Sequence, residues 1–148
     1  MPSTYISFHY HIVFSTKNRA PHLHPEWRPR LHRYMGGIVK GLEGYPQIIN
    51  GIEDHVHLLI ALRSTHRFSD FMRDLKSGSS KWVHDEIGNN DFSWQEGYAA
   101  FTVSSASRSR VYAYIANQEQ HHGRTPYRDE LEMMLKMAGV RYDPRYLD

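Results

Sequence analysis

Two short segments of this chain each carry a His-x-His pair inside a stretch of mainly apolar residues. The first, YISFHYHIVFST, alternates between an apolar side and a mixed side, and His9 and His11 fall on the mixed side. The second, HVHLLIAL, begins with His55 and His57. Alternation with a period of two predicts a β-strand with one apolar face, so the first pair belongs to a strand that must bury one side. We expect the second segment to be a strand as well.

The order of the predicted elements defines the fold class. Apolar periodicity, caps and breaker residues predict strands at 5–16, 46–54, 55–62 and 97–104, and helices from 25 or 26 to about 40, at 70–87, from 105 or 107 to 118, and at 125–139. The first six elements follow the order βαββαβ, which is the ferredoxin-like motif. We therefore expect an α+β fold with an antiparallel sheet, helices on one face of the sheet, and additional C-terminal helices.

This motif also fixes the neighbours of the two histidine-bearing strands. The first and third strands lie side by side at the centre of such a sheet. If Val56, Leu58 and Ile60 face the helices, the histidines of both strands face the opposite side, and four imidazoles share one surface. A register slip of one residue would reverse this orientation.

The composition favours one ordinary globular domain. The 148 residues carry a formal charge of +2, 40% of them are hydrophobic and 23% are charged, so we expect a single domain over 1–148. The lack of cysteine excludes disulfides and thiolate metal sites. No apolar run of the sequence reaches the ~18 residues that cross a bilayer, and the first residues do not resemble a signal peptide. We therefore expect a cytoplasmic protein whose mild positive charge permits a nucleic-acid partner without requiring one.

The paired histidines favour a metal site if a third ligand lies nearby. Residues i and i+2 of a strand project side by side, roughly 6.5–7 Å apart at Cα, so two imidazoles can reach one ion. In the segment RVYAYIANQEQHH, Tyr114 and Gln118 are four residues apart and share one helical face. Two plainer interpretations stay open. One is a solvated polar face without a ligand, and the other is Tyr114 packed in the core with Gln118 at its exposed edge.

Taken together, these segments resemble the single-tyrosine HUH transposases of small bacterial insertion sequences. DHVHLLIAL is similar to the His-hydrophobic-His segment of that family, and YIANQEQHH is similar to its catalytic helix with a Tyr-x-x-x-Gln pattern. FMRDLKSGSSKWVHDE and FSWQEGYAAFTVS resemble the intervening helix and strand, and HYHIVFSTKNR resembles the first strand. The similarity covers nearly the whole chain, in the order of the family.

The resemblance implies a metal-dependent endonuclease that cuts and rejoins single-stranded DNA at insertion-sequence ends. Tyr114 would be the nucleophile that forms a 5′-phosphotyrosine link and leaves a free 3′-hydroxyl. His55, His57 and Gln118 would hold one Mg²⁺ or Mn²⁺. Because the covalent link preserves the phosphodiester energy, rejoining would need no nucleotide cofactor.

The same resemblance implies two partners, namely single-stranded DNA with hairpins and a second copy of the chain. An open sheet face that carries Val13 and Leu59 would be poorly compatible with water, which also favours a homodimer. The candidates for contact with DNA are basic or imidazole side chains at element ends and on polar faces. They are His11, Lys17, Arg19, Lys76, Lys81, Arg108 and Arg110.

Two other functions compete with that of an active transposase. A domesticated relative would bind hairpin DNA and process repeated palindromes without mobilising an element. A ferredoxin-like module for metal or small-molecule binding would hold an ion with no DNA cleavage and little affinity for DNA.

Overall fold

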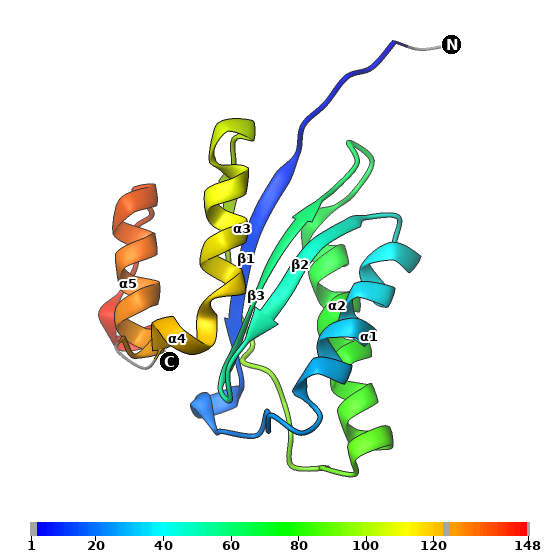
Figure 1. Ribbon diagram of the computed structural model, residues 1–148, viewed down its shortest axis with the longest axis vertical. Coiled ribbons are helices and arrows are strands. Elements are labelled where there is room, and N and C mark those ends of the chain that lie inside the picture. The colour runs from blue at the N-terminus through cyan, green and yellow to red at the C-terminus, as the bar shows by residue number, and fades with distance from the viewer. Residues whose placement is uncertain (1–2, 123–124, 148) are drawn as a thin grey trace.

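A four-stranded antiparallel sheet in the order β2-β3-β1-β4 forms the centre of the computed structural model, which describes residues 3–122 and 125–147 (Figure 1). The first six elements are β1 (His9–Ser15), α1 (Arg28–Gly41), β2 (Tyr45–Gly51), β3 (His55–Ala61), α2 (Phe68–Trp82) and β4 (Ala99–Val103). The predicted βαββαβ order and the central β1–β3 pair are both confirmed, and so is the α+β class.

Three α-helices follow the sheet where the sequence predicts two, because the first predicted helix is divided into α3 and α4. They are α3 (Arg108–Ala116), α4 (Gln118–His122) and α5 (Tyr127–Ala138). Figure 1 shows α1 and α2 on one face of the sheet and α3 to α5 on the other. Within the described ranges, no helix combines the length and the apolar character needed to span a membrane.

The alternation of β1 and β3 divides their side chains between the two faces. Ile12 and Leu58 join the main core, where they pack with residues of α1 and α2 such as Leu31 and Leu75. The neighbours of Leu58 in β3 point the other way, because successive side chains of a strand alternate. The predicted orientation is therefore confirmed, and the histidine pairs face α3 to α5.

The face that we expected to be open is covered by the chain's own C-terminal helices. Val13 packs with Leu131 and Leu135 of α5, and Leu59 packs with Ile115 of α3. Both strand residues are fully buried. Our argument that these apolar side chains require a partner subunit is therefore wrong, and the homodimer stays a prediction.

Several element boundaries differ from the predicted ones, and two of these differences have clear local reasons. β1 begins at His9 rather than Tyr5, because its partner strands end opposite His9, at Ala61 and Val103. The third helix breaks at Asn117, whose side-chain Nδ2 donates to the carbonyl of Ala113 at 2.9 Å. A side chain that bonds to the backbone in this way competes with the helical hydrogen bonds.

The tight connection between β2 and β3 depends on a glycine. A Cβ atom on Gly51 would lie 2.2 Å from the carbonyl oxygen of His55. Only glycine permits this approach. The turn over residues 52–54, which the sequence predicts near Glu53 and Asp54, therefore brings His55 to a fixed position at the start of β3.

We predict that Leu58→Ala and Leu59→Ala each lower the free energy of unfolding by about 2–5 kcal/mol. These neighbours point to opposite faces, and both are fully buried. Denaturant titration followed by circular dichroism measures the change. Met137→Ala, at a side chain that is 83% exposed on α5, is the control and should change the free energy by less than about 0.5 kcal/mol. A Leu59→Ala variant as stable as this control would contradict the cover of the second face.

Candidate active site

His55 and His57 lie at the centre of the sheet and are completely buried. The register of the β1–β3 pair places Ser15 opposite His55 and Val13 opposite His57. Both imidazoles project toward the C-terminal helices, on the face where Val13 packs against α5. The two rings lie with their centroids 5.1 Å apart, so they are close enough to act on one group.

Helix α5 brings a carboxylate to both imidazoles. Glu130 is 2% exposed. Its Oε1 lies 3.0 Å from Nε2 of His57 and 3.4 Å from Nε2 of His55. One ligand atom from each of these three residues lies within 4.8 Å of the others. A buried group of two imidazoles and one carboxylate could hold a metal ion.

The other ring nitrogen of each histidine also has a partner. Nδ1 of His55 lies 2.7 Å from Oδ1 of Asp54, and Nδ1 of His57 lies 2.8 Å from Nε2 of His11. Such outer partners fix the ring orientation and the tautomer of a ligating imidazole. Each Nε2 is therefore turned toward Glu130.

The charges around these rings shift their protonation in opposite directions. Burial alone would lower the pKa of His55, but the hydrogen bonds and charges of Asp54 and Glu130 outweigh it and raise that pKa. Burial lowers the pKa of His11 to about 3, and His57 adds to that effect while Glu130 opposes it. His11 is therefore a neutral imidazole near pH 7, and its ring can form one hydrogen bond with the ring of His57.

Tyr114 reaches the same carboxylate from α3. Its hydroxyl donates a hydrogen bond to Oε2 of Glu130, the oxygen that the histidines do not share. Burial raises the pKa of Tyr114, and so does Glu130, whereas a hydrogen bond from Gln118 acts in the opposite direction. The phenol is therefore neutral in this arrangement, next to the group that could hold a metal.

Gln118 is buried beside Tyr114, although the helix breaks between them. Its Nε2 donates to the main-chain carbonyl of Tyr114 at 3.3 Å. Its Oε1 is buried and has no hydrogen-bond partner within the part of the chain that the structure describes. An amide oxygen without a partner is a donor that suits a divalent cation, so the imidazole, carboxylate and amide donors of these residues fit such an ion by their chemistry.

Comparison with known proteins identifies the family. The family described as "Transposase IS200 like" matches residues 4–118, which is most of the chain. This chain belongs to the IS200-like transposase family. The family's match thus includes His55, His57, Tyr114 and Gln118, and it ends before Glu130.

Two relatives illustrate this membership. The transposase for insertion sequence element IS200 of Salmonella typhimurium is 29% identical over 119 residues, which are 74% of this chain and 75% of the relative. The ISDra2 transposase TnpA of Deinococcus radiodurans is 25% identical over 127 residues, covering 74% of this chain and 82% of the relative.

Two solved structures share the fold. A crystal structure described as a putative transposase from Deinococcus radiodurans R1 gives a TM-score of 0.66 at 24% identity, covering 80% of this chain and 95% of the other. The structure of a REP-associated tyrosine transposase bound to a REP hairpin gives 0.61 at 17% identity, covering 84% and 74%.

Glu130 is the residue of this transposase that sequence reasoning missed. It lies three residues after Tyr127 and one before Leu131, both of which are buried on the apolar stripe of α5. Residues three apart in a helix share a face. A carboxylate on an otherwise apolar stripe therefore indicates a buried acid that has a hydrogen-bonding or charged partner. The sequence does not show which residue that partner is, because it lies far away along the chain.

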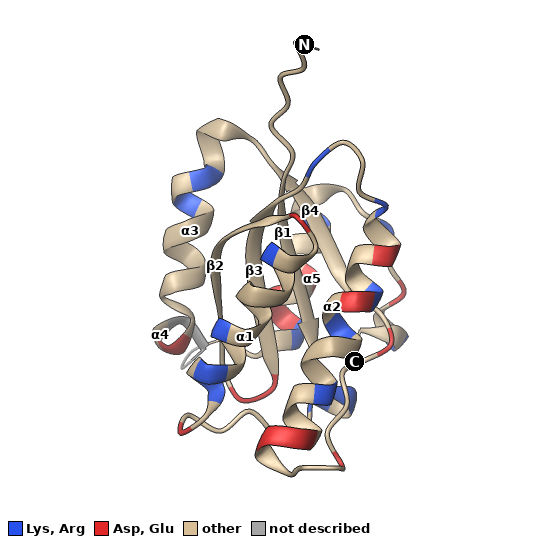
Figure 2. Ribbon diagram, turned by 90° about the vertical axis from the view of Figure 1, so that its right-hand side faces the viewer, with Lys and Arg blue, Asp and Glu red and all other residues tan. Residues whose placement is uncertain are grey.

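The predicted DNA-contacting residues divide into two groups in the transposase. His11, Arg108 and Arg110 lie around α3, whose basic residues are at its N-terminal end (Figure 2). Arg110 lines a hollow of about 420 Å³ that also reaches Tyr114 and Glu130. This group is therefore close to the candidate active site.

Of the other four candidates, Arg19 also lies near the site, because its charge lowers the pKa of Tyr127, and the ring centroid of Tyr127 is 4.5 Å from that of His55. Lys17 and Arg19 belong to a single 3₁₀ turn after β1. Lys76 donates to three carbonyls of the loop before β4, those of residues 95, 96 and 97. Lys81 pairs with Asp85 at 2.7 Å. Lys76 and Lys81 belong to α2, which covers the sheet face opposite to the site.

We predict that Glu130→Ala weakens Mn²⁺ binding by roughly tenfold or more, because even the outer partners of metal ligands change affinity about 10–100-fold. Isothermal titration calorimetry of the whole chain measures the affinity. Glu132→Ala is the matched control on the same helix, since that side chain pairs with Lys136 at 3.8 Å and should leave binding unchanged. Equal affinities for the Glu130 variant and the unchanged chain would exclude Glu130 as a ligand.

Proposed function

We propose that this transposase cuts and rejoins single-stranded DNA through a covalent bond to Tyr114. The observation that carries the proposal is the double contact of Glu130. One carboxylate oxygen faces the Nε2 atoms of His55 and His57, and the other accepts the hydroxyl of Tyr114. A nucleophile and a cation-binding group are thus joined through one side chain.

The proposed step is a transesterification. The Tyr114 oxygen bonds to the phosphorus of the scissile phosphate, and the bond from phosphorus to the 3′ oxygen breaks. The proton that the phenol loses balances the one that the 3′ hydroxyl gains. The product is a 5′-phosphotyrosine link, and the reverse step rejoins a strand without a nucleotide cofactor.

His55 and His57 would hold one divalent ion, with Glu130 or Gln118 as the further ligand. When bound, the ion would polarise the scissile phosphate and neutralise charge that develops on it. Imidazoles bind later divalent metals more readily than Mg²⁺, which favours Mn²⁺ of these two ions, and the oxygen of Glu130 or Gln118 suits either one. We propose Mg²⁺ or Mn²⁺ on this basis.

The substrate would be a strand that carries hairpins at the ends of an insertion sequence. Two named relatives are transposases of insertion sequences, and a structure with the same fold holds a REP hairpin. That second likeness favours an alternative, a domesticated relative that processes repeated palindromes without mobilising an element. Copies flanked by element ends would support the first function, and a single copy among repeated palindromes would support the second.

The proposal includes a homodimer in the bacterial cytoplasm. The homodimer rests on the family resemblance alone. The apolar residues of the sheet face do not require a partner subunit, since helices of the same chain cover them. Light scattering at micromolar concentration tests the homodimer, and a mass of one chain, 17.4 kDa, would contradict it.

We predict that the chain forms a covalent adduct with a hairpin-bearing single strand in the presence of Mn²⁺, and that Tyr114→Phe abolishes the adduct. The variant keeps the ring and removes the attacking oxygen. A denaturing gel with a labelled oligonucleotide is the measurement. Tyr146→Phe, at a tyrosine that is 76% exposed and lines neither hollow beside α3, is the matched control and should form the adduct as before. An adduct that persists in Tyr114→Phe would remove Tyr114 from its role.

A further inference from the structure

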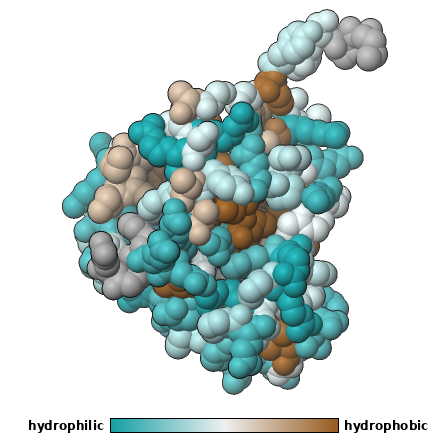
Figure 3. All heavy atoms as spheres, viewed as in Figure 1, coloured by the Kyte–Doolittle hydropathy of each residue, from teal (hydrophilic) through white to brown (hydrophobic). Residues whose placement is uncertain are grey.

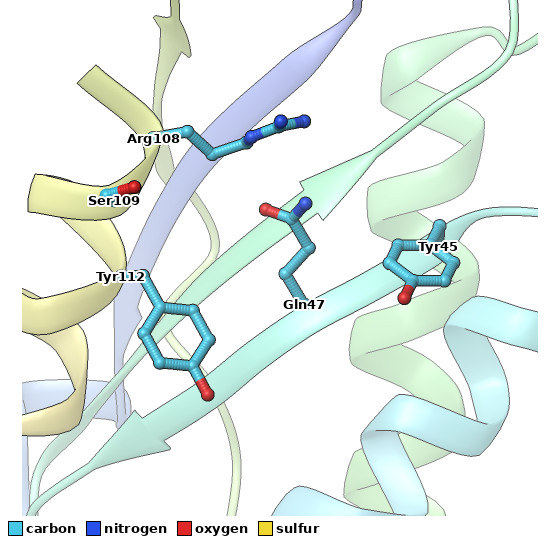
Figure 4. Close-up of a pocket in the computed structure, with 5 residues that line it drawn as sticks. All are labelled: Tyr45, Gln47, Arg108, Ser109 and Tyr112. Atoms are coloured by element: carbon cyan, nitrogen blue, oxygen red, sulfur yellow. The ribbon is translucent and has the colours of Figure 1, made fainter. Parts of the chain in front are cut away.

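A second hollow lies on the opposite flank of α3 from Tyr114. Its volume is about 370 Å³, within the ~300–1,000 Å³ range of pockets that hold small organic groups. Figure 4 shows Tyr45 and Gln47 reaching it from β2, and Arg108, Ser109 and Tyr112 reaching it from α3. We call it the β2–α3 groove.

A β-bulge turns Gln47 into this groove. The pairing of β2 with β3 shifts between Pro46 and Ile48, so Gln47 is the extra residue of an edge strand. Ile48 packs on the α3 side with Leu59, and Gln47 lines the groove on that same side. Regular alternation would send these two neighbours to opposite faces, and bulges are known to re-aim a side chain in this way.

The amide of Gln47 has an unmet hydrogen-bonding atom. Its Oε1 is buried and has no partner in the described part of the chain. Buried polar atoms are normally paired with protein, water or a ligand. Figure 4 shows the side chain of Gln47 rising from β2 between Tyr112 and Tyr45, with its amide turned toward the side where Arg108 lies.

Two tyrosine rings stand open at the ends of the groove. Tyr45 is 63% exposed and Tyr112 is 46% exposed. They come from different elements and line the same hollow. Exposed aromatic rings of this kind are the surfaces on which proteins stack the bases of single strands, because every base has a π-face.

Arg108 supplies the charge of the groove and is held in place. Its Nη1 donates to Nε2 of His9 at 2.9 Å, and Nδ1 of His9 lies 3.2 Å from the hydroxyl of Ser7. The residues that line the groove include no carboxylate. The site therefore favours an anionic ligand with a flat, polar-edged ring over a cation or a purely apolar group.

The position of the groove relates it to the proposed reaction. Tyr112 and Tyr114 are two residues apart on α3, about 200° around the helix. Arg108 and Arg110 are likewise two apart, and they line the groove and the Tyr114 hollow, respectively. A strand that crosses the N-terminal end of α3 would pass from one hollow to the other beside basic residues.

We infer that the β2–α3 groove binds one unpaired nucleotide of the DNA strand that flanks the cleaved phosphate. The base stacks on Tyr112 and Tyr45, the amide of Gln47 hydrogen-bonds to the edge of the base, and Arg108 contacts the adjoining phosphate. This inference rests on the proposed function for the identity of the strand, but the groove itself contains none of the proposed catalytic residues.

The test uses the whole chain and a hairpin oligonucleotide with single-stranded flanks. The fluorescent base 2-aminopurine replaces one flank position at a time, and stacking on a tyrosine quenches its emission. We expect quenching at one flank position. Tyr112→Ala and Tyr45→Ala should remove the quenching there and weaken binding about tenfold in fluorescence anisotropy, since stacking is worth roughly 5–150-fold per base.

Three variants control for folding and for specificity. Tyr112→Phe keeps the stacking ring and should retain both quenching and affinity. Tyr146→Ala removes a tyrosine that is 76% exposed outside the groove and should change neither. Gln47→Ala should keep the quenching but reduce the preference for one base at the quenched position. Alanine variants of Tyr45 and Tyr112 that bind and quench like the unchanged chain would overturn the inference.

The outcome separates this inference from the proposed function. Adduct formation at saturating oligonucleotide reports on Tyr114, and quenching reports on the groove. Quenching without any adduct would support the groove and contradict the cleavage. An adduct with no quenched flank position would support the cleavage and contradict the groove.

Discussion

The central pair of strands, β1 and β3, sets the conditions for everything else in this protein. Six of the seven residues of β3 are buried, so both faces of this strand lie in the interior. An unpaired polar group in such a place costs about 1–3 kcal/mol. His55 and His57 therefore need hydrogen-bonding partners from the second face, and the C-terminal helices have to supply them as well as cover Leu59 and Val13.

Helix α5 meets both needs with one stripe of side chains. Leu131 and Leu135 cover Val13, and the ring of Tyr127 lies 4.5 Å from that of His55. Glu130, on the same stripe, faces both imidazoles and accepts the hydroxyl of Tyr114. The same position of α5 thus buries the sheet and forms the contacts of the candidate site. Because Glu130 has partners in these contacts, its carboxylate is tolerated in the interior.

Helix α3 separates two hollows of different character. On one flank, the hollow at Tyr114 is lined by methionines of α5 and by Arg110. On the other flank, the β2–α3 groove presents tyrosines and an amide. In the view of Figure 3, hydrophobic side chains gather at the centre of the visible surface, between α3 and α1, and the side chains around them are mainly hydrophilic. In the proposed reaction, this short helix would present the attacking phenol of Tyr114 on one flank and a stacking surface for a base on the other flank.

Three features could be predicted from the amino-acid sequence: the order of the elements, the central pairing of the histidine strands and the direction in which their imidazoles point. These follow from the period-two alternation and from local caps and turns, which depend only on neighbouring residues. The sequence also indicated Tyr114 and Gln118 as a pair, and their contact survives the helix break at Asn117.

The contacts that those side chains make could not be predicted in the same way. Glu130 is 73 positions from His57, and its approach depends on how α5 docks, which no local pattern encodes. The same docking covers the face that we expected to be open. The bulge that turns Gln47 toward α3 arises from the pairing of two strands, so the alternation within β2 alone could not predict it. Contacts between distant segments depend on the summed packing of the whole chain, and for that reason they became visible only in the folded molecule.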